Sequence, residues 1–120
     1  MVRVYVAGAY SADNVMGVLH NIGKGIKLSF QVFKAGYAPF CPWLDYHYVL
    51  EDVDEELIVP DFYNYSIAFL VVCHAVLLVP GWENSKGTAA ELAIADDLSI
   101  PVFDNLEELI ATFPISVKPI

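Results

Sequence analysis

Residues 75–95, AVLLVPGWENSKGTAAELAIA, contain the pattern that decides the fold of this chain. The continuous apolar run at 75–79 predicts a strand that is buried on both faces, as strands of parallel sheets are. Residues 80–82 end this strand, a polar loop follows, and a helix is predicted from residue 87 or 88 to Leu98. A buried strand that leads through a short loop into a helix is the repeating unit of α/β folds.

The remainder of the chain repeats this alternation of strand and helix. Apolar periodicity predicts strands over Arg3–Ala7, Tyr37–Cys41 and Ile100–Phe103, and helices over about 14–35, 61–73 and 105–112. Residues 43–59 are the least regular part, and their acidic run EDVDEE predicts a solvated helix start or a loop. Alternating elements with short links predict a small doubly wound parallel sheet, flavodoxin- or Rossmann-like, of four or five strands with helices on both faces.

The first predicted helix contains three glycines, Gly17, Gly23 and Gly25. Each glycine inside a helix costs about 1 kcal/mol relative to alanine, so their presence suggests close packing on the sheet or on a partner helix. Residues 11–13, Ser-Ala-Asp, offer N-cap side chains for this helix, and Gly36 is suited to its C-terminal end.

Length and composition restrict the class of protein. A chain of 120 residues is the size of a single domain, here residues 1–120, and 57% hydrophobic residues exclude a disordered protein. The 15 acidic and 6 scattered basic residues leave a net charge of −9, which argues against a nucleic-acid-binding surface and a polybasic membrane anchor. So large an apolar fraction predicts exposed apolar patches, and hence a homo-oligomer, either a dimer or a larger assembly.

Cysteine usage and the start of the chain predict a cytoplasmic protein with two buried thiols. Cys41 and Cys73 form no CxxC pair, and the chain opens on a strand rather than a secretory signal. The apolar run 67–80 has about 14 residues, fewer than the roughly 20 that span a bilayer, so it is read as a helix end and a buried strand. No metal site is expected, because the cysteines lack tight ligand spacing with the three histidines, His20, His47 and His74.

Two loops are expected to meet if the first and third strands are neighbours in the sheet. These loops, residues 8–11 and 81–87, would lie beyond the carboxyl ends of the strands, where such sheets bind ligands. Ser85 is suited to cap the following helix, and Gly87 leaves its first turn open to an anion such as phosphate. An ordinary capped helix has the same pattern. Neither loop has P-loop or GxGxxG spacing, so we expect no nucleoside triphosphate chemistry and no nicotinamide cofactor.

Glu91 is the candidate for catalysis on that helix. It shares a helix face with Gly87 and Thr88, which places it near the helix N-terminus. If it faces the crevice, its carboxylate is suited to attack an electrophilic sugar carbon; the alternative is an exposed helix glutamate. Tyr5 lies in the middle of the first strand, and Tyr10, just after that strand, is expected to face the crevice.

Aromatic side chains form a second candidate group. The set suited to stacking on a flat ring is Trp43, Tyr46, His47, Tyr48 and Trp82, although the same side chains would also pack around an irregular loop. Asp45 and His47 are candidates to exchange a proton with a leaving group.

Four segments together resemble the nucleoside 2-deoxyribosyltransferase-like superfamily. They are VYVAGAYS at 4–11, NI at 21–22, GYAPFCP at 36–42 and LLVPGWENSKGTAAELAIA at 77–95. The resemblance covers about residues 2–110 and is closest to short, mostly uncharacterised members common in bacteria and phages. The deoxynucleoside 5′-monophosphate N-glycosidases are more distant relatives.

The resemblance implies chemistry on an N-glycosidic bond without a cofactor. Glu91 matches the family glutamate that attacks the anomeric carbon of a 2′-deoxyribosyl group, and Tyr5 matches the tyrosine that helps to position it. Ser85 stands where transferases acting on nucleosides carry an aspartate and the monophosphate hydrolases a serine. The implied substrate is therefore a small 5′-phosphorylated nucleotide, whose phosphate Ser85, Gly87 and the Gly8 loop would hold.

The chain departs from the family pattern at two positions. Many relatives carry aspartates where this chain has Ser66 and His74. The first of these aspartates is linked to leaving-group activation, for which Asp61, or Asp45 and His47, would have to substitute. The departures also suit a non-catalytic nucleotide-binding or sensor module. A purely structural or partner-binding domain is a third interpretation, which the crevice between the two loops disfavours.

Overall fold

The computed structural model describes residues 1–115 of the chain. In chain order its elements are β1 (Arg3–Ala7), α1 (Val15–Lys34), β2 (Ala38–Phe40), the 3-10 helix η1 (Pro42–Asp45), α2 (Tyr46–Glu51), α3 (Val59–Leu70), β3 (Ala75–Leu78), the 3-10 helix η2 (Trp82–Asn84), α4 (Lys86–Asp97), β4 (Val102–Phe103) and α5 (Leu106–Thr112). The predicted α/β class is confirmed. The predicted single domain also includes residues 116–120, which lie outside the described range.

The four strands form one parallel sheet in the order β2-β1-β3-β4. The first and third strands are neighbours, as the crevice prediction required, and Tyr5 pairs with Val76 in their register. Strand order reverses between β1 and β3. The carboxyl ends of these two central strands therefore mark the place where a doubly wound sheet binds its ligands.

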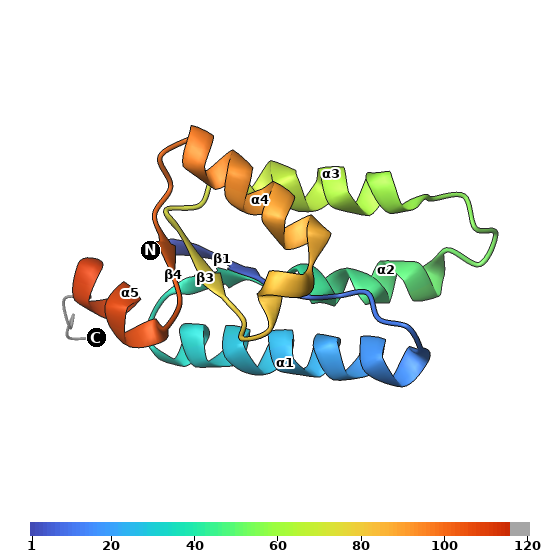
Figure 1. The fold of residues 1–120 in the computed structure, drawn as a ribbon, viewed down its shortest axis with the longest axis horizontal. Coiled ribbons are helices and arrows are strands. Elements are labelled where there is room, and N and C mark those ends of the chain that lie inside the picture. The colour runs from blue at the N-terminus through green and yellow to red at the C-terminus, as the bar shows by residue number, and fades with distance from the viewer. Residues whose placement is uncertain (116–120) are drawn as a thin grey trace.

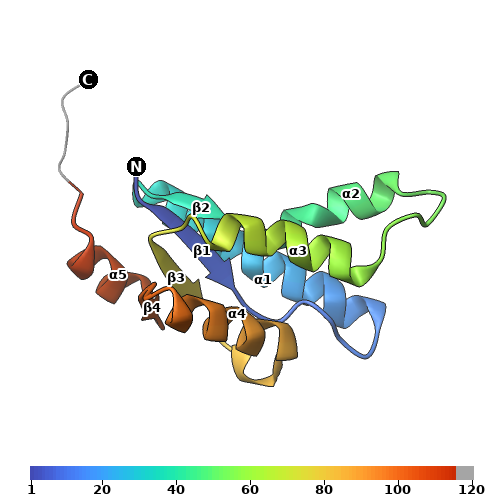
Figure 2. The same ribbon diagram turned by 90° about the horizontal axis from the view of Figure 1, so that it is seen from above.

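Helices cover both faces of the sheet, because alternate side chains of β1 point to opposite sides. Val4 and Val6 belong to the core that the sheet forms with α1 and α5. Tyr5 and Ala7 belong to the core on the other face, which includes residues of α3 and α4. Figures 1 and 2 show this layering, with α1 on one side of the sheet and α3 and α4 on the other.

The ends of several elements differ from the predicted ones. Helix α1 begins after Asn14 rather than after residues 11–13, because the Asn14 side chain accepts a hydrogen bond from the Gly17 N–H at 2.8 Å. Helix α3 ends at Leu70 rather than Cys73, whose N–H turns back to the Leu70 carbonyl. In both places a local hydrogen bond, which residue periodicity does not report, sets the boundary.

The irregular region predicted at 43–59 consists of η1, the short helix α2 and a loop. Asp52 orders the loop, since its carboxylate oxygens accept hydrogen bonds from the N–H groups of Glu56 and Leu57 at 2.9 and 3.0 Å. The acidic run thus ends a helix and forms a loop. Figure 1 shows that α2 and this connection extend beyond the sheet.

The two cysteines are free and buried, as predicted. The apolar run 67–80 is the end of α3, a turn and strand β3. Within residues 1–115, no helix has both the length and the apolar character that a membrane crossing requires.

Candidate functional site

A cavity of about 780 Å³ lies at the carboxyl ends of β1 and β3, on the face covered by α3 and α4. Its walls come from β1 and the loop after it, η1, the α2–α3 connection, α3 and the start of α4. The predicted site residues that line it are Tyr5, Gly8, Tyr10, Asp45, Ser85, Gly87 and Glu91. The fold therefore brings both predicted loops and the predicted carboxylates into one cavity.

Glu91 faces this cavity rather than bulk solvent. Its side chain is 9% exposed, and one carboxylate oxygen, Oε2, accepts a hydrogen bond from the hydroxyl of Tyr5, which is fully buried. Burial raises the pKa of Glu91 to about 7, and the hydrogen bond from Tyr5 opposes this rise. The pKa of Tyr5 is also raised, by burial first and by the Glu91 charge second, so the hydroxyl remains a proton donor.

The start of α4 forms the next part of the cavity. Gly81, at φ +93°, allows the chain to turn after β3, and Ser85 then caps the helix. The Ser85 hydroxyl oxygen accepts hydrogen bonds from the Thr88 N–H at 3.2 Å and the Thr88 hydroxyl at 2.9 Å. N–H groups in the first turn of a helix have no intrahelical acceptor, and Lys86 and Gly87 of that turn line the cavity. This geometry suits an anionic group.

A second tyrosine–carboxylate pair lines the same cavity. The Tyr10 hydroxyl donates to Asp45 Oδ1 at 2.7 Å, and Asp45 is 8% exposed. Burial raises the pKa of Asp45, while the bond from Tyr10 lowers it. Trp43 supports this side of the cavity, because its Nε1–H donates to the Ala9 carbonyl at 3.0 Å and so anchors the loop after β1.

Two predicted site residues do not line the cavity. His47 is exposed on α2 and lies against Tyr46, with ring centroids 4.1 Å apart. Trp82, the first residue of η2, packs against the core between the sheet, α3 and α4. Of the aromatic set expected to stack on a flat ring, Trp43 is the member that lines the cavity.

The cavity also contains residues that the sequence did not single out for it, namely Phe62 and Tyr63 of α3 and the fully buried Thr88 of α4. Ser66, noted above as a departure from the resembling family, lines the cavity from the same face of α3. The spacing of Tyr63 and Ser66, one helical turn apart, is a signal that could have linked them. Ser66 is 7% exposed, and a hydrogen bond from it lowers the pKa of Tyr5.

His74, the other position where the chain departs from the resembling family, lies at the opposite end of the sheet. It precedes the amino end of β3, where its Nδ1 accepts a hydrogen bond from the Arg3 N–H at 2.9 Å. His74 therefore has a structural contact and does not reach the cavity.

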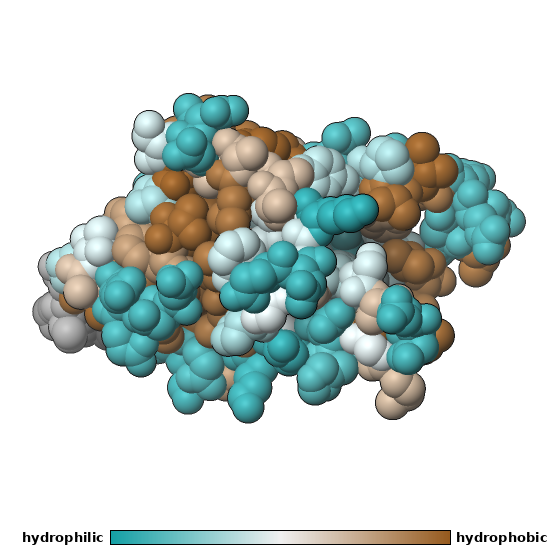
Figure 3. Space-filling model, viewed as in Figure 1, coloured by the Kyte–Doolittle hydropathy of each residue, from teal (hydrophilic) through white to brown (hydrophobic). Residues whose placement is uncertain are grey.

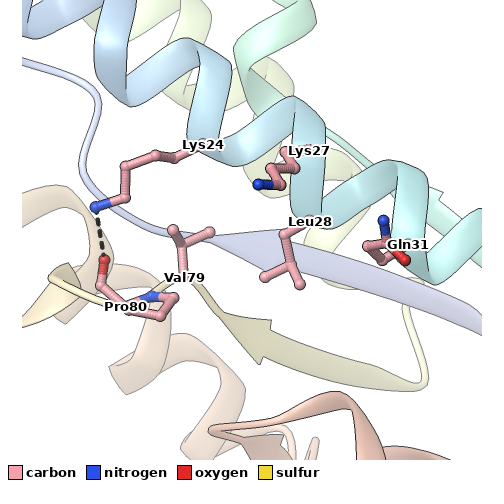
Figure 4. A pocket seen from close by; sticks show the side chains of 6 residues that line it. All are labelled: Lys24, Lys27, Leu28, Gln31, Val79 and Pro80. Atoms are coloured by element: carbon pink, nitrogen blue, oxygen red, sulfur yellow. Dashed lines mark hydrogen bonds between the residues drawn. The ribbon is translucent and has the colours of Figure 1, made fainter.

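A smaller hollow of about 250 Å³ lies between α1 and the segment that follows β3. Figure 4 shows its lining and the hydrogen bond from Lys24 Nζ to the Pro80 carbonyl, at 3.1 Å. No acidic or thiol side chain lines it. Within residues 1–115, no three His, Cys, Asp or Glu side chains gather as a metal site would need. The larger cavity is thus the candidate site.

Residues 2–104 match a protein family described as a domain of unknown function, DUF4406. No curated protein matches the chain significantly. The matched range contains all four strands and every residue of the two tyrosine–carboxylate pairs.

Proposed function

The chain belongs to the DUF4406 family, and we propose that it cleaves or exchanges the N-glycosidic bond of a (2′-deoxy)nucleoside 5′-monophosphate. The observation that carries the proposal is the position of Glu91: a buried carboxyl group in a cavity, hydrogen-bonded by Tyr5. The first turn of α4 opens into the same cavity and offers a place for phosphate. The resemblance to the nucleoside 2-deoxyribosyltransferase-like superfamily supports the same chemistry.

In the proposed first step, a carboxylate oxygen of Glu91 forms a bond to C1′ of the sugar. The C1′–N bond breaks, and its electron pair stays on the departing base. The transition state has oxocarbenium character, which a nearby carboxylate stabilises. Water or a second base then attacks C1′ and releases Glu91. The hydrogen bond from Tyr5 favours the ionised carboxylate that this step needs, against the effect of burial.

The 5′-phosphate would sit at the start of α4. The Ser85 hydroxyl already accepts two hydrogen bonds from Thr88, so its own proton is free to be donated. A donor hydroxyl beside the N–H groups of a helix N-terminus favours a phosphate dianion, whereas an aspartate at this position would repel it. The Gly8 loop lines the same cavity, and we propose that it helps to hold the phosphate.

Ser66 favours a second candidate function, that of a non-catalytic nucleotide-binding or sensor module. Ser66 lines the cavity where many relatives in the resembling superfamily carry an aspartate. In this function the same cavity would bind a nucleotide without cleaving it. Under either function we place the protein in the cytoplasm, without a cofactor and with a small nucleotide or nucleoside as its partner.

The test is incubation of the protein with a broad panel of ribo- and deoxyribonucleotides, with chromatographic detection of free base. Base release that is lost in Glu91→Gln supports the catalytic function. Saturable nucleotide binding without base release over hours supports the binding module. Base release that is unchanged in Glu91→Ala would exclude Glu91 as the nucleophile.

A further inference from the structure

We propose that Asp45, held in place by Tyr10, is the general acid that protonates the leaving base. This inference rests on the proposed function, since it assigns a second catalytic group to the same reaction. A purine or pyrimidine departs slowly as an anion, so a glycosidase needs a proton donor on the side of the base. Ser66, which lines the cavity from α3, has no carboxyl group that could supply this proton.

Asp45 is placed for this role by two elements that meet at the cavity. It ends η1, directly after β2, while Tyr10 lies in the loop that follows β1. These elements form the wall on the β2 side, whereas Glu91 and Ser85 belong to the segment after β3. A nucleotide with its phosphate at Ser85 and its sugar at Glu91 would extend its base toward α3 and Asp45.

The second oxygen of Asp45 opens into the cavity. Tyr10 donates to Oδ1, and among residues 1–115 the structure gives Oδ2 no donor. Every fully buried side-chain oxygen in that range has a hydrogen-bond partner. Since Oδ2 has none, it is not fully buried and must have accessible surface. Because Asp45 lines the cavity and is 8% exposed overall, this surface faces the cavity. A proton on Oδ2 would therefore point at a ligand.

The acidity of Asp45 also suits a proton donor. Burial is the largest influence on it and raises the pKa of the carboxyl group above its ordinary value. Tyr10 acts in the opposite direction and is itself a weak acid, since its pKa is raised by burial and by Asp45. Tyr10 therefore orients the carboxyl group without competing as the proton donor.

The other acid–base candidates lie elsewhere. His47 is exposed outside the cavity. Asp61 caps α3, where its Oδ2 accepts a hydrogen bond from the Ile58 N–H at 2.8 Å, and it does not line the cavity. Asp45 and Glu91 are the carboxyl groups that line it.

The proposed step is balanced without any further reactant. Glu91 forms its bond to C1′, the C1′–N bond breaks, and the proton of Asp45 Oδ2 moves to a basic nitrogen or carbonyl oxygen of the base. The base leaves neutral, and Asp45 becomes a carboxylate. In the second step Asp45 takes a proton back from the attacking water or base, which restores both carboxyl groups.

The experiment compares two substrates that differ in their need for a proton. One is the best nucleotide of the panel. The other is its activated counterpart: the N7-methylated nucleotide for a purine, whose base leaves without protonation, or the 5-fluoro nucleotide for a pyrimidine, whose base is a better anion. General acids contribute about 100- to 10,000-fold, so Asp45→Asn should slow the ordinary substrate at least about 100-fold and the activated substrate far less.

Tyr10→Phe tests the positioning role. The quantity compared is the rate on the ordinary substrate divided by the rate on the activated one. Tyr10→Phe should lower this ratio, as Asp45→Asn does, but only by about tenfold, because the carboxyl group remains and is less well oriented. Asp61→Asn is the matched control, an acid outside the cavity, and should leave the ratio unchanged. Because the ratio is measured within one protein sample, partial unfolding of a variant cancels from it.

The outcomes separate the two proposals. If the unaltered protein releases base from neither substrate, the proposed function fails. If it releases base from both in a Glu91-dependent way, and Asp45→Asn slows both equally or neither, the role of Asp45 is overturned while the proposed function stands. A shifted ratio in Asp61→Asn would assign the proton to Asp61 instead.

Discussion

Glu91 and Tyr5 lie 86 residues apart in the chain, yet their side chains form the central hydrogen bond of the cavity. Two opposing influences act on Glu91: removal from water raises its pKa to about 7, and the bond from Tyr5 lowers it. A nucleophile must be ionised, whereas desolvation disfavours the ion. Tyr5 thus helps to keep Glu91 ionised, in addition to filling the core.

The first prediction concerns the pH dependence of the proposed reaction. On the activated substrate, whose base needs no proton from Asp45, kcat/KM should rise with pH through about 7 and then level off, because Glu91 must lose its proton to act. Tyr5→Phe removes the bond that lowers the pKa, so the rising limb should move to higher pH. A pH profile of both proteins on one nucleotide measures this. A limb that stays in place in Tyr5→Phe would contradict the role of Tyr5.

The second prediction concerns stability and does not require activity. The pKa of Glu91 rises from its ordinary 4.5 to about 7 on folding, so the folded state binds the proton more tightly. Its contribution is fully present below about pH 4.5 and is lost as the pH rises through about 7. Glu91→Gln cannot ionise, so at pH 8 it should be more stable than the unaltered protein, by at most about 3 kcal/mol.

Urea unfolding at pH 5 and pH 8 measures this difference. The two proteins should have similar free energies of unfolding at pH 5 and diverge at pH 8. Parallel pH dependences would show that Glu91 is not held in a desolvating site.

At the scale of elements, α1 approaches η1 so closely that glycine is required at one position. A methyl group on Gly25 would lie 2.2 Å from ring atoms of Trp43, whereas one on Gly23 would meet nothing within 4 Å. The close packing predicted from the glycines of this helix therefore occurs at Gly25, against η1. Trp43 in turn anchors the loop after β1 through the Ala9 carbonyl. Gly25 thus supports the wall of the cavity from behind.

The third prediction uses this pair of glycines. Gly25→Ala should destabilise the protein by about 1–3 kcal/mol or more, because the added methyl group overpacks Trp43. Gly23→Ala should stabilise it by up to about 1 kcal/mol, since alanine is the better helix former and the site is open. Thermal or urea unfolding of both variants checks this. Equal effects of the two substitutions would contradict the close contact between α1 and Trp43.

At the scale of the whole molecule, many large apolar side chains remain exposed. Figure 3 shows apolar patches on the viewed face, near the β3–β4 edge and near the ends of α2 and α3. Exposed aromatic side chains also link these two helices, since the rings of Tyr48 and Tyr65 have centroids 6.0 Å apart. Phe69 of α3, exposed as well, stacks on Phe40 of β2. Residues 62–73 contain no acidic or basic side chain, although the chain has a net charge of −9. An uncharged surface is where so acidic a chain can meet its own copy without repulsion.

The fourth prediction follows from that surface. We expect a homodimer, with a mass twice the 13.3 kDa of the chain, that uses the α2–α3 surface around Tyr48, Tyr65 and Phe69. Light scattering after size-exclusion chromatography measures the mass. Phe69→Glu should shift it toward the monomer, and Phe33→Glu, an equally large change on the exposed side of α1, should not. If Phe33→Glu lowered the mass and Phe69→Glu did not, the interface would lie on α1 instead. A monomeric unaltered protein would contradict the expectation that so apolar a chain forms a homo-oligomer.

Local signals in the sequence determined the elements of this protein. The β-branched run Arg3–Ala7 ended by Gly8 and the capped helix after Ser85 were predicted almost to the residue, because each depends on neighbours in the chain. The tertiary structure decided the site. The order β2-β1-β3-β4 brings Tyr5 to Glu91 and Tyr10 to Asp45. Trp82 instead packs against the core, and His47 is exposed on α2 outside the cavity. Side-chain direction and long-range pairing depend on which surfaces are buried together, and periodicity along one chain does not contain that information.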